Sequence, residues 1–148
     1  VTPQAGDVVF SYETKLGAAA IIPDGLICCL GRRMALIRLR QEMIDPRFYL
    51  FQYLSPPYQR YLSDRYVSGA TVDRLSLREL PTYMMRVPSL ETQARIVDVH
   101  QRLQRESQAL ENRSVAKLGR LSDLKQSILH KAFAGELTGT PAELEAVS

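Results

Sequence analysis

Cysteine and histidine are scarce in this 148-residue chain, which contains two of each. The two cysteines, Cys28 and Cys29, are adjacent, so in an extended segment their side chains would point to opposite faces. This arrangement favours neither a structural disulfide nor a four-ligand zinc site, and His100 and His130 lie far away in the sequence. We therefore predict no metal site, and the reduced thiols fit a cytoplasmic protein.

Long apolar runs are also missing. The longest uncharged one, around Gly17–Ile22, is far shorter than the roughly 20 residues with which a helix spans a membrane. The chain starts at Val1 without a charged segment followed by an apolar one, so we expect no secretory signal. A first residue other than methionine raises the expectation that the sequence is a fragment.

Catalytic motifs are largely absent: there is no P-loop, no Gly-rich loop after a strand and no carboxylate pair beside a histidine. One stretch, Ser55-Pro56-Pro57-Tyr58, resembles the motif with which amino-methyltransferases hold a flipped base. That chemistry also needs a Gly-rich loop for the methyl donor. We interpret the stretch as a Pro-Pro break between two helices, and we predict a non-catalytic chain without a cofactor.

The first 87 residues read as a small α+β domain, since the chain is 45% hydrophobic and can bury one modest core. Short apolar runs between turn residues predict strands at Asp7–Tyr12, Ala18–Ile22, Leu26–Leu30 and Met34–Leu39. A buried helix is then predicted from Asp45-Pro46, followed by a short helix at Tyr58–Ser63, a loop around Gly69, a helical piece at Leu75–Leu80 and a strand at Tyr83–Val87.

One long helix is predicted after the Pro88-Ser89 boundary. Ser89 is a good N-cap, and from there to about Ala134 the chain has no proline and one glycine, Gly119. About 45 helical residues would extend about 65 Å, far longer than a usual globular helix. We assign residues 88–136 to this helix as a spacer or dimerisation element and residues 137–148 to a flexible tail.

Apolar residues repeat along this helix with coiled-coil spacing. Two sets at intervals of seven are separated by eleven residues, as a four-residue stutter would produce. The predicted seam comprises Ile96, Leu103, Leu110, Leu121, Leu124 and Ile128. Packing of the helix along its own domain is the alternative, but the stretch Gln104–Lys117 is mostly polar, which favours a partner helix.

The excess positive charge lies in the first segment. Residues 1–87 carry eleven Lys and Arg against eight Asp and Glu, whereas residues 88–148 carry eight of each. A polyanion would therefore bind the first segment. Turn cations and loop hydroxyls could contact DNA phosphates, although each could also be an ordinary solvated side chain. The candidate DNA-binding residues are Lys15, Arg32, Arg33, Arg65, Ser68 and Thr71.

Four segments in order resemble the second half of a specificity (S) subunit of a type I restriction-modification system. These are GDVVFSYETKLG, RMALIRLRQEMIDPRFYLFQYLSPPYQRYL, SGATVDRLSLRELPTYMMRVPSLETQARIV and LSDLKQSILHKAFAGELT. The most telling features are Gly69 and Thr71, which lead to Pro88-x-Leu90-x-x-Gln93, and the terminal LKQSIL-x-KAF-x-GEL. The resemblance covers residues 5 to 138.

The resemblance implies a division of labour. A complete S subunit carries two target recognition domains, each for one half of a split double-stranded DNA target, joined by long antiparallel helices. Methyltransferase (M) subunits dock on those helices and bring the methyl donor and the catalysis, and restriction (R) subunits join the assembly. Chemistry would then lie outside this chain.

This chain is short for such a subunit, with one partial recognition segment and one long helix. It would be either a C-terminal piece or a half-subunit that pairs with a second half or forms a homodimer through the helix. The rival from another class is a self-associating coiled-coil scaffold or regulatory module without DNA binding. Salt-sensitive binding to duplex DNA discriminates the two.

Overall fold

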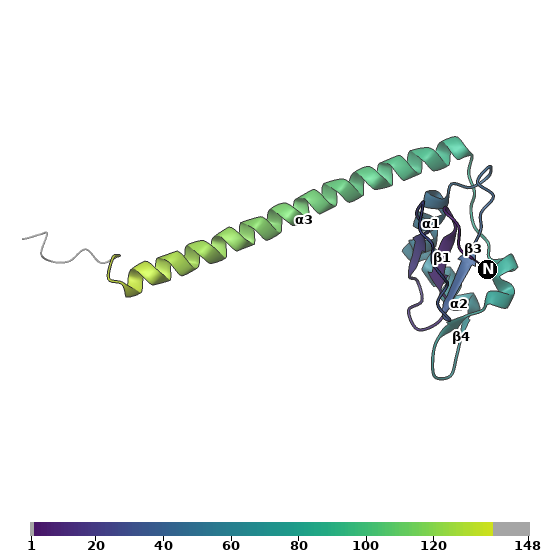
Figure 1. Ribbon diagram of the computed structural model, residues 1–148, viewed down its shortest axis with the longest axis horizontal. Helices are drawn as coiled ribbons and strands as arrows, with labels where there is room; N and C mark the ends of the chain where they lie inside the picture. Colours follow the sequence, from purple (N-terminus) through teal and green to yellow (C-terminus); the bar gives the residue numbers. More distant parts are fainter. Residues whose placement is uncertain (1, 138–148) are drawn as a thin grey trace, which may run out of the picture. The chain divides into compact units, whose positions relative to one another are not determined.

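The computed structural model describes residues 2–137 (Figure 1). Its internal contacts divide the chain after Gln101 into two compact units. The elements of the first unit are β1 (Val8–Ser11), β2 (Ala19–Ile21), β3 (Met34–Ile37), α1 (Pro46–Leu54), α2 (Pro56–Tyr66), β4 (Val67–Ser68), β5 (Arg74–Leu75) and a 3-10 helix, η1 (Leu77–Thr82). The helix α3 (Leu90–Phe133) begins in this unit and continues as the second one. The predicted α+β class with a long C-terminal helix is confirmed.

The main sheet has three antiparallel strands in the order β2-β1-β3. Val8 of the central strand is the register partner of Ile21 on one side and of Ile37 on the other. Helix α1 packs on β2, and α2 packs on both α1 and the β4–β5 hairpin. The strands β1, β2 and β3 each fall inside one of the predicted strands. Helix α1 starts after Asp45, whose carboxylate accepts a hydrogen bond from the Arg47 amide at 2.7 Å.

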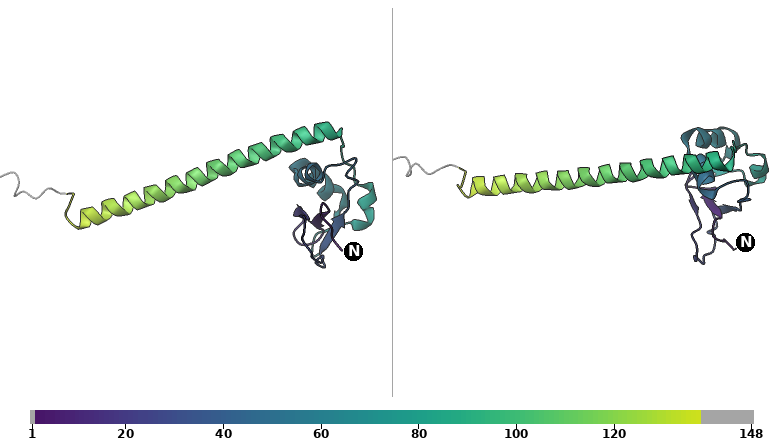
Figure 2. Two further views of the ribbon diagram at one scale, coloured as in Figure 1. Left: turned by 45° about the horizontal axis from the view of Figure 1, so that its top comes forward. Right: turned by 90° about the horizontal axis from the view of Figure 1, so that it is seen from above.

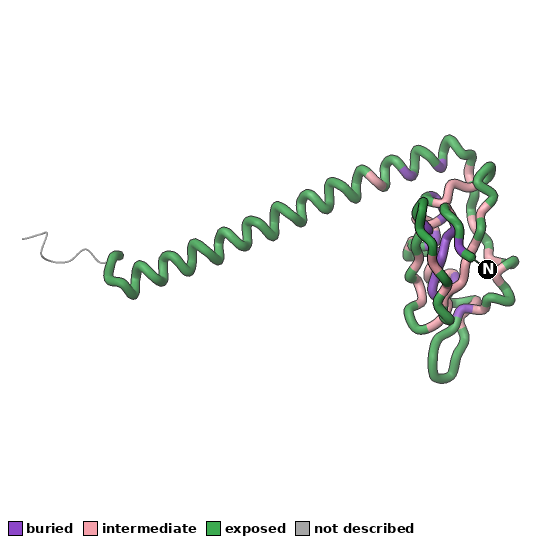
Figure 3. The backbone as a smooth tube through the Cα atoms, viewed as in Figure 1, coloured by how far each residue is buried: buried purple, intermediate pink, exposed green. Residues whose placement is uncertain are grey.

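Buried residues of the first unit lie within the sheet and the segments packed on it (Figure 3), and three of the seven residues in its core cluster are tyrosines. Its buried members are Val8, Phe10, Tyr49, Tyr53, Tyr58, Leu62 and Leu75. The ring of Tyr53 contacts Phe10 at 5.5 Å between centroids and Tyr58 at 6.2 Å, which ties the sheet to both helices. Such offset aromatic pairs add stability beyond the area they bury.

The strand predicted at Leu26–Leu30 is wrong, because this segment is an irregular loop between β2 and β3. Both edges of β1 are occupied by those two strands, so it offers no third pairing. The Leu26 amide donates a hydrogen bond to the Pro23 carbonyl at 3.4 Å, in a turn that carries the chain away from the sheet. The Ile27 side chain is 93% exposed. The apolar run has the composition of a strand, but its hydrophobicity is not used for burial.

The strand predicted at Tyr83–Val87 is also wrong, although the segment is extended. Side chains rather than a neighbouring strand satisfy its backbone. The Met84 amide donates to the Tyr61 hydroxyl at 3.0 Å. The Gln52 amide, with its nitrogen facing the Arg86 carbonyl at 2.9 Å and its oxygen facing the Arg86 amide at 3.1 Å, imitates a strand partner.

Three smaller differences from the predicted elements concern α2, the loop around Gly69 and the helical piece after that loop. Helix α2 starts at Pro56, because proline is well suited to a first helical turn, and it runs to Tyr66 instead of ending at Ser63. The predicted loop forms the β4–β5 hairpin, with Val67 paired to Leu75. The helical piece predicted from Leu75 begins two residues later as η1, since Leu75 belongs to β5.

Helix α3 is a single helix of 44 residues, about 66 Å long at 1.5 Å per residue (Figures 1 and 2). At its start the Ser89 carbonyl accepts from the Gln93 amide at 2.9 Å. It ends at Phe133, two residues before Gly135, which adopts a φ of 77°, and the Glu136 amide donates to the Lys131 carbonyl at 2.9 Å. The predicted flexible tail lies outside the described residues except for Leu137. Among the described helices, none is long and apolar enough to cross a membrane.

An ion pair between the buried Asp7 and the half-exposed Arg38 holds the start of the sheet. The Asp7 side chain is 3% exposed and accepts two hydrogen bonds from Arg38, at 2.8 and 2.7 Å, and one from the Gln4 amide at 2.8 Å. The hydrogen bonds from the Arg38 guanidinium lower the pKa of the Asp7 carboxyl below its ordinary value of 3.8, against the opposing effect of burial.

Asp7 therefore makes part of the stability depend on pH. Because its pKa is lower in the folded chain than in the unfolded one, the stabilisation is fully present above about pH 4 and is lost as the pH falls through the folded pKa. We expect Asp7→Asn to lower the midpoint of urea unfolding at pH 7 and to flatten its decline below pH 4. An Asp24→Asn control, at an exposed turn, should keep the wild-type decline. If the midpoint of urea unfolding of Asp7→Asn declined below pH 4 as it does in wild type, Asp7 would not be the cause of that decline.

Candidate nucleic-acid interface and helix seam

One carboxylate holds Arg33, a candidate DNA-binding residue, together with Arg74, which is not among the six candidates. Glu13, in the turn after β1, contacts Arg33 at 3.3 Å and Arg74 at 2.9 Å. Glu13 also forms an isolated β-bridge with Arg74 of β5. The Lys15 amide donates to the Glu13 carbonyl at 2.9 Å. One end of the domain thus carries two exposed arginines on a single acidic side chain, with the exposed Lys15 in the same turn as that side chain.

Arg32 belongs to the same end of the domain. Its carbonyl accepts the Tyr12 hydroxyl at 2.8 Å, and the Tyr12 amide donates to the Arg33 carbonyl at 3.2 Å. These two hydrogen bonds fix the backbone of the turn before β3, from which the exposed Arg32 side chain extends. Tyr12 therefore acts as a support for the cations.

The two hydroxyl candidates lie on the β4–β5 hairpin. Ser68 is paired with Arg74, and the exposed Thr71 lies in the turn. Gly69 is required there, because a Cβ at this position would approach the Val72 carbonyl oxygen to 2.0 Å. The pairing of Ser68 with Arg74 connects the hairpin to the Glu13 cluster, defined as Glu13, Lys15, Arg32, Arg33 and Arg74.

Arg65 is positioned by a different contact, since its guanidinium lies 5.3 Å from the centre of the Tyr61 ring. The sequence presents Arg74 only as one turn cation among several, and it does not identify Glu13 as the residue that gathers them. The only sequence signal for Glu13 is an isolated acidic residue within a turn, which gives no indication of its two arginine partners.

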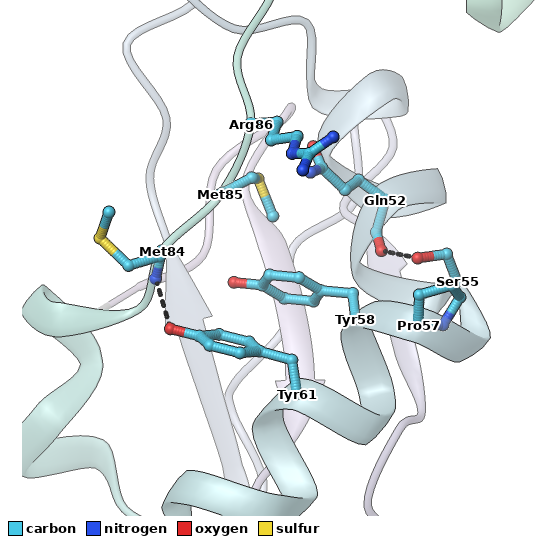
Figure 4. A pocket seen from close by; sticks show the side chains of 8 residues that line it. All are labelled: Gln52, Ser55, Pro57, Tyr58, Tyr61, Met84, Met85 and Arg86. Carbon is cyan, nitrogen blue, oxygen red and sulfur yellow. Dashed lines mark hydrogen bonds between the residues drawn. The ribbon is translucent and has the colours of Figure 1, made fainter.

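The SPPY-like stretch borders a cavity of about 650 Å³ (Figure 4). Ser55, Pro57, Tyr58 and Tyr61 form one side, and Met84–Arg86 and Gln52 form the other. The Ser55 hydroxyl donates to the Gln52 carbonyl at 2.7 Å, and burial raises the pKa of Tyr58 to about 12. Ser55 is the N-cap of α2, and Tyr58 is a core residue. These contacts agree with the predicted break between two helices.

Gln93 joins the start of α3 to the domain. It is fully buried, and its side-chain oxygen accepts the Asp45 amide at 2.9 Å while its nitrogen donates to the carbonyls of Met43 at 2.9 Å and Pro88 at 2.8 Å. Val97, one turn later, is also fully buried. His100 stacks on Phe51 with ring centroids 3.8 Å apart. Three successive turns of α3 are thus fixed to α1 and its preceding loop.

The six seam residues stay uncovered by the described residues. Their exposed fractions range from 42% for Ile96 to 61% for Leu110. The histidines and the free cysteines build no metal site: within residues 2–137, no group of three or more metal-ligating side chains occurs.

Comparison with known proteins identifies relatives of this chain. No family model matches the chain. A type I restriction enzyme EcoBI specificity subunit from Escherichia coli is 31% identical over 134 residues, which cover 89% of this chain and 28% of that subunit. The chain is homologous to part of this specificity subunit. The resemblance found in the four quoted segments is confirmed.

Solved structures agree with this relationship. A chain from a study of complex assembly and conformational transition of the type I R-M system is 29% identical, with a TM-score of 0.71 over 92% of this chain and 32% of that one. The HsdS subunit from Thermoanaerobacter tengcongensis shares the fold, with 23% identity and a TM-score of 0.64 over 95% of this chain and 35% of that one. The chain spans about a third of the length of these relatives.

Proposed function

We propose that the chain is a DNA sequence-recognition component of a type I restriction-modification system. Residues 1–87 form a partial target recognition domain for one half of a split target, and residues 88–136 form the spacer and pairing helix. The observation that carries the proposal is the relationship to a specificity subunit across nearly the whole chain. The chain itself carries no catalysis in this proposal, and it acts in the cytoplasm.

The Glu13 cluster supplies the phosphate contacts. Arg33 and Arg74 are held on one carboxylate, and their side chains remain 52% and 62% exposed. A phosphate can therefore approach either guanidinium without unfolding the turn. Lys15, Arg32, Ser68 and Thr71 extend this surface along the β1 turn and the hairpin, and Arg65 adds a cation at the end of α2.

The partners in this proposal are double-stranded DNA, M and R subunits, and a second helix. The exposed seam provides the surface for a helix from a second half-subunit or a second copy, and the same helix docks the M subunit. The exposed seam alone also favours the rival function, a self-associating scaffold without a DNA role. Loss of all salt-sensitive duplex binding with pairing intact would favour that rival.

The double variant Arg33→Ala with Arg74→Ala tests the DNA-binding surface. We expect weaker binding to duplex DNA and a decrease of about two in the slope of log affinity against log salt, about one for each phosphate that is no longer bound. Fluorescence anisotropy of a labelled duplex at several salt concentrations measures both. Arg120→Ala, an exposed cation on α3, is the matched control and should leave the slope unchanged. Equal slopes for the double variant and wild type would refute these assignments.

A further inference from the structure

The cavity beside α2 has two unlike walls (Figure 4). The rings of Tyr58 and Tyr61 form the wall on the helix, with their centroids 5.6 Å apart. The side chains of Met84 and Met85 form the wall on the extended segment. Aromatic rings and thioethers both pack well against flat π systems. The volume of about 650 Å³ is typical of a small-molecule site, so a flat aromatic group has room between these walls.

Two polar side chains of the cavity are already bonded to the extended segment. The Tyr61 hydroxyl accepts a hydrogen bond from the Met84 amide at 3.0 Å. The Gln52 amide is bonded to the backbone of Arg86, at 2.9 and 3.1 Å. These bonds join α1 and α2 to residues 84–86, so the two walls are held at a fixed separation without a ligand.

The Tyr58 hydroxyl, in contrast, is free to bind a ligand. The residue is only 8% exposed, yet its hydroxyl forms no hydrogen bond with residues 2–137. No buried side-chain polar atom of the described residues lacks a partner, so this hydroxyl is open to the cavity, and Figure 4 shows it directed toward the segment of Met84 and Met85. Because burial raises the pKa of Tyr58 to about 12, the hydroxyl stays protonated at neutral pH and can donate to an acceptor.

The Arg86 side chain is the second free group of the cavity. Its guanidinium is exposed and forms neither an ion pair nor a hydrogen bond with the described residues, while its backbone is held by Gln52. A guanidinium without a carboxylate beside it favours an anion, and its planar fork matches a phosphate. The cavity therefore combines space for a flat ring, one hydrogen-bond donor and one phosphate-binding cation.

A nucleotide carries the three matching features in one molecule. Its base is flat and has carbonyl or ring-nitrogen acceptors, and its phosphate is negatively charged. An aromatic peptide side chain would fill the space between the walls but would bring no anion for Arg86. The surroundings also favour a nucleotide, because Arg65, a candidate phosphate contact, lies 5.3 Å from the centre of the Tyr61 ring.

We propose that this cavity binds one nucleobase between its tyrosine and methionine walls, with the Tyr58 hydroxyl donating to the base and Arg86 bound to the phosphate of the same nucleotide. The proposal rests on the proposed function, which brings DNA to this domain, and it adds a site for a single unpaired nucleotide. The nucleotide is either a base turned out of the bound duplex or a free nucleotide, and the experiment distinguishes these sources. The site binds and does not catalyse.

Three labelled duplexes of one sequence test the site on the full chain. The first is fully paired, the second carries one extra unpaired nucleotide, and the third carries the same bulge without its base. An unpaired base enters a pocket without the cost of breaking a pair. We expect the chain to bind the second duplex at least about fivefold more tightly than the other two, the lower end of what contact between a base and aromatic side chains contributes. Fluorescence anisotropy gives the dissociation constants.

Two substitutions and two matched controls locate the effect. Tyr58→Phe removes the hydroxyl and keeps the ring, and Arg86→Gln removes the charge; each should lower the preference for the bulged duplex by about threefold or more. Tyr49→Phe removes a hydroxyl from a core tyrosine that does not line the cavity. Arg78→Gln removes an exposed cation of η1. Both controls should keep the wild-type preference. The ratio of bulged to paired affinity is the readout, so a general loss of charge cancels.

Titration calorimetry with the four deoxynucleoside monophosphates completes the test. A preference for the bulged base that both substitutions lower supports the site with a DNA base as occupant. Equal binding of the three duplexes, with monophosphate binding that both substitutions weaken, supports it with a free nucleotide. Equal binding without monophosphate binding overturns the site, as does a preference that survives both substitutions. Failure to bind any duplex contradicts the proposed function instead, and the monophosphate titration then decides the site by itself.

Discussion

Replacement of Gln93 by leucine is expected to lower the free energy of unfolding by about 3 to 5 kcal/mol, because a fully buried side chain with three hydrogen bonds is removed. Leucine fills a similar volume but leaves the Asp45 amide and the Met43 and Pro88 carbonyls without their partner. A hydrogen-bonding group that is left without a partner away from water costs about 1 to 3 kcal/mol. Urea unfolding followed by tyrosine fluorescence measures the decrease.

The matched control for this substitution is Gln104→Leu, an exposed glutamine on the same helix. It changes the same atoms without breaking a buried bond, so we expect an unfolding free energy within about 0.5 kcal/mol of wild type. Gln93→Glu keeps the acceptor for the Asp45 amide but turns a carboxylate toward two carbonyls, and it should be destabilising as well. Wild-type stability in Gln93→Leu would show that α3 is held to the domain by other contacts.

Introduction of aspartate into the seam is expected to weaken self-association by at least about a hundredfold. Ile128→Asp places a charge from each copy into an apolar layer, and the desolvation of a carboxylate without a partner costs several kcal/mol. A hundredfold change corresponds to about 3 kcal/mol. Leu124→Asp should act in the same direction. Sedimentation velocity over a range of concentrations gives the dissociation constants.

Gln126→Asp separates burial from charge, because Gln126 follows Leu124 by two residues, about 200° around the helix, and therefore adds the same carboxylate on the side away from the seam. We expect it to dimerise like wild type, and we expect both variants to retain the thermal transition of the first unit. A wild-type chain that stays monomeric at every concentration, or an Ile128→Asp variant that dimerises normally, would contradict the assignment of the seam.

The sequence predicted most of the regular elements because their signals are local. Asp45-Pro46 and Ser89 mark helix starts through capping chemistry, and the absence of proline between Ser89 and Ala134 predicts the length of α3. It failed at Leu26–Leu30 and Tyr83–Val87, where the outcome depends on neighbours distant in sequence. No local pattern shows that β1 is already paired on both sides, or that Gln52 and Tyr61 satisfy an extended segment in place of a strand.

The candidate sites also differ in whether local patterns or residues distant in sequence determine them. The seam is a prediction from heptad spacing alone, because helical periodicity determines which side chains share a face. In the sequence, Gln93 is notable only as part of the Pro88-x-Leu90-x-x-Gln93 motif, because no local pattern shows that Met43, Asp45 and Pro88 surround it. Glu13 gives no signal for a similar reason: its partners, Arg33 and Arg74, are 20 and 61 residues away. Polar networks between distant segments were the least predictable part of this fold.

The central claim is that this chain brings sequence recognition to a methyltransferase, and methylation of duplex DNA tests it most directly. The chain is co-purified with its cognate M subunits, and incorporation of labelled methyl groups is measured with wild-type chain, with the Arg33→Ala, Arg74→Ala variant and without the chain. We predict sequence-dependent methylation with the wild-type chain, a large decrease with the variant and none without the chain. Methylation that is the same with and without the chain would contradict the account.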